Sequence, residues 1–316
     1  MHAMNLSTAV VGVGYLGRFH AQKYAALDDC ELVGVADPDA EAAGACAGPL
    51  GVPALTDYRE LLGRVDAVSI AAPTSLHHAI ALDFLRHGSH VLVEKPITVT
   101  VAEAQDLVDA ADAGGLVLQV GHLERFNPAL RAADAILDAP RFIESHRLAP
   151  FNPRGTDVDV VLDLMIHDID IILDVVRSSV ARADASGAEV LTGATDIANA
   201  RLVFENGCVA NVTASRVSAK KERRMRFFQH DCYLAVDFQD RCLTVHRKGE
   251  QEMYPGIPEL VTEEHRFEAG DAIRDEIEAF LDSIRSGTPP LVSGADGCRA
   301  LAAAIDITGH FGTAPA

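Results

Sequence analysis

The segment Ala-Val-Val-Gly-Val-Gly-Tyr-Leu-Gly-Arg at residues 9–18 places a GxGxxG loop directly after a β-branched apolar run and directly before an amphipathic stretch. Gly12 permits a tight turn, Gly14 lets a ligand approach the backbone, and Gly17 lets the following helix pack closely on its strand. We therefore predict a dinucleotide-binding turn, with the pyrophosphate at the helix N-terminus. The competing interpretation is an ordinary glycine-rich turn.

A second apolar run, residues 31–37, ends in Asp37 about 20 residues past Gly17. At this spacing a carboxylate accepts hydrogen bonds from the adenosine ribose hydroxyls. Pro38 and Asp39 follow, so the local charge would repel a 2′-phosphate, and the neighbouring residues include no Lys or Arg. The pattern favours NAD over NADP. The alternative role for Asp37 is to cap the next helix.

Length and charge limit the classes of protein that the chain can represent. Its 316 residues are 48% hydrophobic, and 27 Lys and Arg against 46 Asp and Glu give a formal charge of −19. This predicts two domains and opposes unaided binding to nucleic acid or anionic membranes. No apolar run reaches the roughly 18 residues of a membrane span, and no leader is evident, so we expect a cytoplasmic protein. The six cysteines form no CxxC pair, and we expect no metal site.

Strand-like runs alternate with helical segments up to residue 121, which predicts a doubly wound parallel sheet. The expected strands are 8–13, 32–36, 67–72, 90–93 and 116–120. After Asn127 the pattern changes to an apolar helix, at about 158–176, and short strands separated by turns. These strands are expected at 142–148, 198–204, 208–215, 223–230, 233–238 and 242–246, and two helices, 272–285 and 297–308, end the chain. We predict an α/β fold with an N-terminal Rossmann domain (1–122) and a C-terminal α+β domain (123–316) on a large, mostly antiparallel open sheet, the C-terminal helix being free to pack back on the first domain.

The strand at 90–93 runs into Glu94-Lys95-Pro96. Ligands of open α/β sheets bind at the carboxyl ends of the strands, so Lys95 is a candidate catalytic residue. Pro96 restricts the preceding backbone and is compatible with a cis bond that would fix the direction of the lysine. The alternative is a surface lysine at the end of a strand.

Asp163 and His167 stand four residues apart on the apolar helix and share one face, with Asp170 one turn later. A carboxylate that accepts one imidazole N–H fixes the tautomer and stabilises the protonated ring, as an acid or base step at a sugar carbon requires. A polar stripe on a buried helix is the alternative. A metal site that adds Asp174 is disfavoured by the uniformity of the stripe.

These motifs, in this order, resemble the Gfo/Idh/MocA oxidoreductases over nearly the whole chain. The resemblance implies a nicotinamide cofactor and a second domain whose sheet builds homodimers or homotetramers. It also implies that Lys95, Asp163 and His167 line the cleft beside the nicotinamide, and that the segment after the strand 67–72 contacts the nicotinamide ribose. The implied cofactor contacts are Gly12, Gly14, Tyr15, Leu16, Gly17, Asp37, Ala72, Pro73, Thr74, His77, Glu94 and Lys95. For His77, a simple helix start is the alternative.

Residues 121–128 and 147–157 look like the branch of this family that oxidises the 3-hydroxyl of UDP-N-acetylglucosamine, so that an aminotransferase can make the 3-amino sugar used in lipid A. The implied substrate contacts are Arg125, Asn127, Arg147, Arg154 and Asp157. On an acidic chain the three arginines could bind a diphosphate through bidentate hydrogen bonds, or each could be salt-bridged. The basic run 220–224 is either a solvated strand edge or a phosphate contact.

We therefore expect an NAD-dependent dehydrogenase of a sugar or UDP-sugar, with Lys95 or His167 as the general base and Asp163 orienting the imidazole. Two alternatives stay open: a free polyol such as inositol, or a UDP-linked uronic acid, as the substrate, and a non-catalytic NAD-binding sensor. The sequence does not choose between the two candidate bases, because a lysine acts as a base only where its pKa is lowered.

Overall fold

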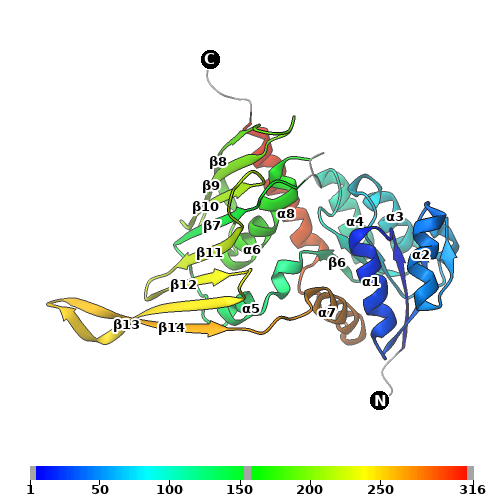
Figure 1. Cartoon of the computed structure of the whole chain (residues 1–316), viewed down its shortest axis with the longest axis horizontal. Coiled ribbons are helices and arrows are strands. Elements are labelled where there is room, and N and C mark those ends of the chain that lie inside the picture. The colour runs from blue at the N-terminus through cyan, green and yellow to red at the C-terminus, as the bar shows by residue number, and fades with distance from the viewer. Residues whose placement is uncertain (1–4, 153–157, 312–316) are drawn as a thin grey trace. The chain divides into compact units, whose positions relative to one another are not determined.

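The computed structural model describes residues 5–152 and 158–311. The chain divides into two compact units, of which the first contains the residues up to 123 together with 271–301, and the second contains 124–270 and the residues from 302 onward (Figure 1). None of the described helices combines the length and the hydropathy that a membrane span needs. The six cysteines are free thiols.

The first unit is built on a six-stranded parallel sheet with the order β3-β2-β1-β4-β5-β6. Its strands are β1 (Leu6–Val11), β2 (Cys30–Ala36), β3 (Ala54–Leu55), β4 (Ala67–Ile70), β5 (His90–Glu94) and β6 (Leu118–Gly121). Its helices are α1 (Tyr15–Ala26), α2 (Ala40–Leu50), α3 (Thr74–Arg86), α4 (Val101–Gly114) and α7 (Ala272–Ser286), with a 3-10 turn at Tyr58–Leu61. A second 3-10 turn, Leu123–Phe126, spans the point in the chain where the second unit begins. This strand order is that of a dinucleotide-binding sheet, whose ligands bind at the carboxyl ends of the strands.

The central strands are continuous apolar runs because helices cover both faces of the sheet. Val10, Val68 and Val91 have no exposed surface. Helix α7 joins this core although it lies 150 residues beyond β6, since Ile277 and Phe280 pack in the same hydrophobic cluster as strand and α1 side chains. The first unit is therefore completed by a late segment of the chain.

The second unit is an eight-stranded sheet with the order β14-β13-β12-β11-β7-β10-β9-β8, in which only β7 and β10 pair in parallel. Its strands are β7 (Phe142–Leu148), β8 (Val180–Ala188), β9 (Ile197–Phe204), β10 (Val209–Ser215), β11 (Glu222–Phe228), β12 (Cys232–Asp237), β13 (Cys242–Tyr254) and β14 (Ile257–Arg266). Helices α5 (Pro128–Asp134) and α6 (Ile166–Val176) pack on one face, and α8 (Gly294–Gly309) contributes residues to both units. The predicted α/β fold with a large, mostly antiparallel second sheet is confirmed.

Three strands were not predicted from the sequence. The two-residue β3 is too short to show a pattern, and β8 is rich in alanine and charged residues. Strand β14 is exposed along nearly its whole length, so it lacks the alternation that a half-buried strand shows, and β13 continues eight residues past the expected end at His246. β13 and β14 extend together beyond the rest of the sheet (Figure 1).

Candidate active site

The three glycines of the first loop are required for two different reasons. Gly12 has a φ of +83°, and a Cβ there would lie 2.6 Å from the backbone nitrogen of Ala72. A Cβ on Gly17 would overlap the carbonyl oxygen of Gly12, whereas a Cβ on Gly14 would meet no atom within 4 Å. Packing therefore requires the first and third glycines, and Gly14 leaves open space at the start of α1, where backbone N–H groups attract an anion.

Asp37 stands at the end of β2 and holds the glycine loop in place. Its carboxylate accepts hydrogen bonds from the backbone N–H of Val13 at 2.9 Å and of Asp39 at 3.0 Å. The N-cap of α2 is Asp39, whose carboxylate accepts from the N–H groups of Glu41 and Ala42. The alternative role for Asp37, as a helix cap, is therefore filled by its neighbour.

A cation that sequence spacing did not suggest lies near this loop. Arg18, on α1, lines a cavity of about 410 Å³ together with Val13, Gln22 and residues of α2. Arg18 directly follows Gly17 in the sequence, and the first turn of α1 brings it to the same cavity as Val13. Val13, which shares the cavity with Arg18, donates its backbone N–H to the Asp37 carboxylate.

Lys95 is half-buried directly after β5, and the Lys95–Pro96 bond is cis. His77 is buried beneath this segment, where its Nδ1 lies 2.9 Å from the carbonyl oxygen of Pro96 and its Nε2 lies 2.8 Å from that of Ala72. The ring thus connects the ends of β4 and β5. This arrangement favours a positioning role for His77 over the expected direct cofactor contact.

A second buried histidine holds the residue before the lysine. The Nε2 of His20 on α1 lies 3.1 Å from the Glu94 carboxylate, and both side chains are buried. The fully buried Glu276 of α7 completes a cluster in which the ligand atoms of the three side chains lie within 4.8 Å of one another. Such a group could hold a metal ion, but a proton on Glu276 also relieves the repulsion between the two carboxyls.

Burial, together with the charge of Glu94, raises the pKa of Glu276 well above its ordinary value of 4.5. Neither of its carboxyl oxygens has a hydrogen-bond partner among the described residues. Because a buried unpaired carboxylate is far more costly than a buried carboxylic acid, Glu276 is the member of the cluster that carries the proton. The sequence held a signal for it: Glu276 lies on the apolar face of α7, between Ile273 and Phe280.

In the second unit, Asp163 and His167 lie on either side of a change in helix type. A π-helical turn spans Val161–Met165 and continues directly into α6, so the pair straddles the junction. Both side chains are partly buried. Single π turns inside helices occur frequently at functional sites, because they redirect side chains that a regular helix would stack.

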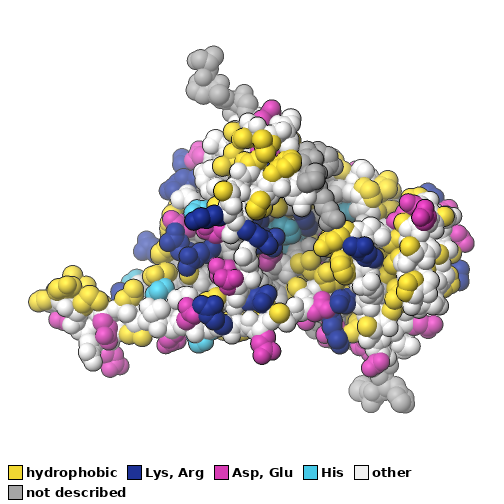
Figure 2. Space-filling view, viewed as in Figure 1, with side chains coloured by type: hydrophobic (Ala, Val, Ile, Leu, Met, Phe, Trp, Pro, Cys, Tyr) yellow, Lys and Arg dark blue, Asp and Glu magenta, His cyan; other side chains and the backbone are white. Residues whose placement is uncertain are grey.

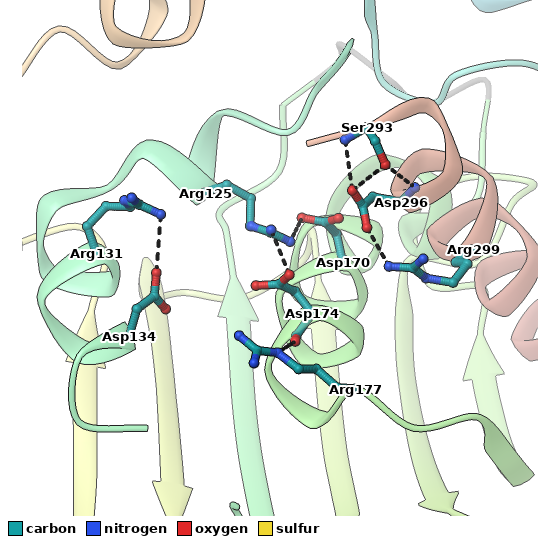
Figure 3. Close-up of polar contacts among 9 residues, drawn as sticks. All are labelled: Arg125, Arg131, Asp134, Asp170, Asp174, Arg177, Ser293, Asp296 and Arg299. Carbon is teal, nitrogen blue, oxygen red and sulfur yellow. Dashed lines mark hydrogen bonds and ion pairs between the residues drawn. The ribbon is translucent and has the colours of Figure 1, made fainter. Parts of the chain in front are cut away.

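Two buried arginines hold the helix that carries His167. The Nη2 and Nε of Arg147 donate to the Asp168 carboxylate at 2.6 and 3.0 Å, and its Nη1 donates to Glu124 at 2.8 Å. Burial alone would lower the pKa of Arg147, but Asp168 and Glu124 outweigh it and the pKa is raised. Arg125 contacts Asp170 at 3.5 Å and Asp174 at 2.9 Å (Figure 3).

These ion pairs bear on the expected substrate contacts. Arg125 and Arg147 are 5% and 3% exposed and neutralise carboxylates of their own unit, which favours a structural role over diphosphate binding. Asn127 caps α5 and donates from its side-chain amide to the carbonyl oxygen of Phe238, and these contacts favour a structural role for it as well. Arg154 and Asp157 lie outside the described residues.

We predict that Glu276→Gln changes how stability depends on pH. A carboxyl group whose pKa is raised by folding holds a proton that the unfolded chain releases above about pH 4.5, so its contribution to the free energy of unfolding falls as pH rises. The slope from this group approaches about 1.4 kcal/mol per pH unit once the pH is about one unit above 4.5 and still below the raised pKa. Glutamine does not titrate, so unfolding curves between pH 5 and 8 should show the variant gaining stability relative to the parent as pH rises.

Glu278→Gln is the matched control, because Glu278 lies on the same helix with its side chain 42% exposed. It should show no such trend. A difference between Glu276→Gln and the parent that stays constant across this range would mean that Glu276 is ionised in the folded protein.

Comparisons with known proteins agree with this fold. Residues 6–122 match the model of an oxidoreductase family with an NAD-binding Rossmann fold, and residues 101–232 match the GFO/IDH/MocA C-terminal domain. The chain is 43% identical over 305 residues to UDP-N-acetylglucosamine 3-dehydrogenase of Acidithiobacillus ferrooxidans, covering 96% of each chain. A solved structure of that enzyme matches with a TM-score of 0.90 at 40% identity, covering 97% of this chain and 98% of the other.

A more distant relative is the scyllo-inositol 2-dehydrogenase (NAD(+)) of Bacillus subtilis, 26% identical over 96% of this chain and 93% of that protein. Both named relatives are dehydrogenases. The resemblance inferred from the sequence motifs is therefore confirmed, and the chain belongs to the Gfo/Idh/MocA family of oxidoreductases, whose first domain binds a nicotinamide cofactor.

Proposed function

We propose that this protein oxidises the 3-hydroxyl of UDP-N-acetylglucosamine to a ketone and reduces NAD. The observation that carries the proposal is 43% identity to an enzyme of that name along 96% of both chains. The inositol dehydrogenase is 26% identical over a similar length, so the substrate assignment follows the more similar relative. A non-catalytic sensor is disfavoured because Lys95, Asp163 and His167 are all present.

For the cofactor we propose NAD, held by the loop of Gly12, Gly14 and Gly17 with Asp37 on the adenosine ribose. The open space at Gly14 and the acid at the end of β2 support this choice. Ala72, Pro73 and Thr74, between β4 and α3, would contact the nicotinamide ribose. Arg18, close to the loop, would favour a 2′-phosphate, so the assay described below includes NADP.

In the proposed mechanism, a nicotinamide held by the glycine loop and by Ala72, Pro73 and Thr74 would supply the acceptor for the hydride of the carbinol carbon. Lys95 or His167 removes the hydroxyl proton, and Asp163 orients the imidazole. The half-buried position of Lys95 and the backbone contacts of His77 support a fixed direction for the ammonium group. The histidine starts with a pKa nearer neutrality and needs less adjustment to act as a base.

The remaining assignments are also proposals. Residues 1–122 would form the cofactor domain and 123–316 the domain for substrate binding and oligomerisation, with residues 271–301 packed in the first unit. Arg154 and Asp157 are the substrate contacts that the described ion pairs do not account for. We further propose a cytoplasmic homodimer or homotetramer whose product feeds the synthesis of a 3-amino sugar of the lipid A type.

The proposed reaction is tested by absorbance at the NADH band with UDP-N-acetylglucosamine, myo-inositol and glucose as substrates, each with NAD and with NADP. An aminotransferase is added to remove the ketone, because its formation from NAD is uphill. We expect turnover with the UDP-sugar and NAD. Turnover with inositol alone would refute the substrate assignment while keeping the family chemistry, and preference for NADP would refute only the role given to Asp37.

Lys95→Met and His167→Ala should each lower kcat about 100-fold or more, since general-base catalysis contributes roughly 10² to 10⁴. NAD affinity should change little, because neither side chain is assigned to the pyrophosphate or the adenosine. Lys248→Met and His265→Ala, both at exposed positions, are the matched controls and should keep full activity. An unchanged kcat in either site variant would remove that residue from the mechanism.

Replacing the glycines by alanine separates cofactor binding from folding. Gly14→Ala should fold normally and weaken NAD binding at least about tenfold, because the new methyl group occupies space assigned to the pyrophosphate. Gly17→Ala should lower the melting temperature instead, because its Cβ overlaps backbone. Gly44→Ala, in open space on α2, is the control for both. Equal NAD affinity in Gly14→Ala and the parent, measured by calorimetry, would contradict the assigned pyrophosphate position.

A further inference from the structure

The helix formed by the π turn and α6 is tied at its start to the residues that flank β9 and β10. The backbone N–H of Val160 donates to the carbonyl oxygen of Thr195 at 3.0 Å, and the N–H of Thr195 donates to the Asp159 carboxylate at 2.9 Å. Arg216 joins both sides, because its Nη2 donates to the carbonyl oxygens of Val158 and Thr195. We call these four hydrogen bonds the start clamp.

A buried carboxylate holds Arg216 in this place. The Nε of Arg216 lies 3.6 Å from Oδ1 of Asp196, and the two residues are 3% and 0% exposed. Asp196 also accepts hydrogen bonds from the backbone N–H groups of residues 190–192 at 2.6 to 2.9 Å, and from the hydroxyl group of Thr192 at 2.7 Å. Because these donors favour the ionised carboxylate, Arg216 lies beside a fixed negative charge.

Burial separates this pair from the charged pairs of the surface. Figure 2 shows acidic and basic side chains mixed over the surface, and Arg182 with Asp184 is such a pair, 3.0 Å apart with side chains 67% and 55% exposed. Solvent weakens exposed pairs, so they hold little in place. The buried Arg216–Asp196 pair tolerates one geometry, because losing either partner leaves the other charge uncompensated in a low-dielectric interior.

The far end of the same helix is fixed as well, since Arg147 pairs with Asp168 there. Between the two fixed ends the helix contains a wide turn, in which the N–H of Ile166 donates to the carbonyl oxygen of Val161, five residues earlier instead of four. Such π turns are rare, and the regular α-helix is the usual conformation. The start clamp and the Arg147 pair together prevent the turn from relaxing to an α-helix.

The π turn affects the two candidate catalytic side chains of this unit. In an α-helix one residue corresponds to about 100° of rotation and 1.5 Å of rise, so relaxation of the turn would rotate its two sides relative to each other by about 100°. Asp163 lies within the turn and His167 lies beyond it. Part of this rotation would therefore change the direction of the carboxylate relative to the imidazole.

We propose that Arg216 and Asp196 are positioning residues for the proton transfer. Through the start clamp they keep the π turn, which sets the direction of the Asp163 carboxylate relative to the imidazole of His167. In this role neither Arg216 nor Asp196 contacts substrate or cofactor, and both act through the backbone of residues 158–160. The inference rests on the proposed function, in which the imidazole and its carboxylate take part in catalysis.

Kinetics with UDP-N-acetylglucosamine and NAD test this role. Arg216→Met should lower kcat at least about tenfold, because small displacements of catalytic groups are costly, and should change the Kd for NAD less than about twofold, because the glycine loop belongs to the first unit. Arg216→Lys keeps the charge beside Asp196 but lacks the planar fork of donors, so its kcat should lie between those of Arg216→Met and the parent. Asp196→Asn should lower kcat in the same way.

Arg182→Met is the matched control, because it removes an arginine from an exposed ion pair of the same unit, and it should keep the parent's kcat. A kcat in Arg216→Met equal to that of the parent would overturn the proposal, as would equal losses of kcat and of NAD affinity. Should Arg216→Met not fold, Arg216→Lys decides alone, and a kcat equal to the parent's would overturn the proposal there.

A second measurement needs no substrate. In a crystal structure of unliganded Arg216→Met or Arg216→Lys, the N–H of Ile166 should donate to the carbonyl oxygen of Leu162, four residues earlier, and the Asp163 side chain should have turned. A π turn and an Asp163 direction identical to those of the parent would overturn the positioning role. Absence of turnover by the parent with any of the sugars would refute the proposed reaction, and the crystal structure would still decide whether Arg216 keeps the π turn.

Discussion

A carboxylate buried at the end of β5 constrains the whole first unit. Glu94 cannot lose its contact with His20 without leaving a charge in a low-dielectric interior, so α1 and β5 are held in one relative position. Glu276 brings α7 to the same point, and His77 holds the next peptide from the side of β4. Lys95 stands between Glu94 and Pro96, which are both held by these contacts, so its backbone has little freedom. A lysine whose backbone is fixed can present its amine at one place.

The second unit also buries charged side chains in pairs. Asp168 and Asp170 of α6 are buried, and Arg147 and Arg125 supply the charges that make their burial possible. Buried ion pairs contribute little net stability compared with apolar packing, but they tolerate only one geometry, and removing one partner is costly. Both candidate catalytic elements therefore rest on ion pairs that fix orientation, which suits a reaction whose proton and hydride transfers need a defined geometry.

The parts that could be predicted from the sequence are those set by local spacing. The glycine loop, the acid at the end of β2 and the apolar strands depend on residues close together in the chain, as does the cis bond before Pro96. The partners of these residues could not be predicted, because His20 and Glu94 are 74 positions apart and Glu276 lies far beyond both. Strand β14 was missed since hydrophobic alternation identifies strands that bury one face, and β14 buries neither.

Arginines in an acidic chain mark an anion site only if the acidic residues are solvated and do not themselves bind the arginines. Asp168 and Asp170 are only 2% and 3% exposed, and each buried carboxylate must be neutralised before an arginine is available to a ligand. Arg147 and Arg125 are occupied in this way, whereas Arg201 and Arg224 face partly exposed sheet surface. The net charge of the chain therefore does not locate a diphosphate site. Surfaces that bind negative charge are identified by the arginines that are not paired with a buried carboxylate.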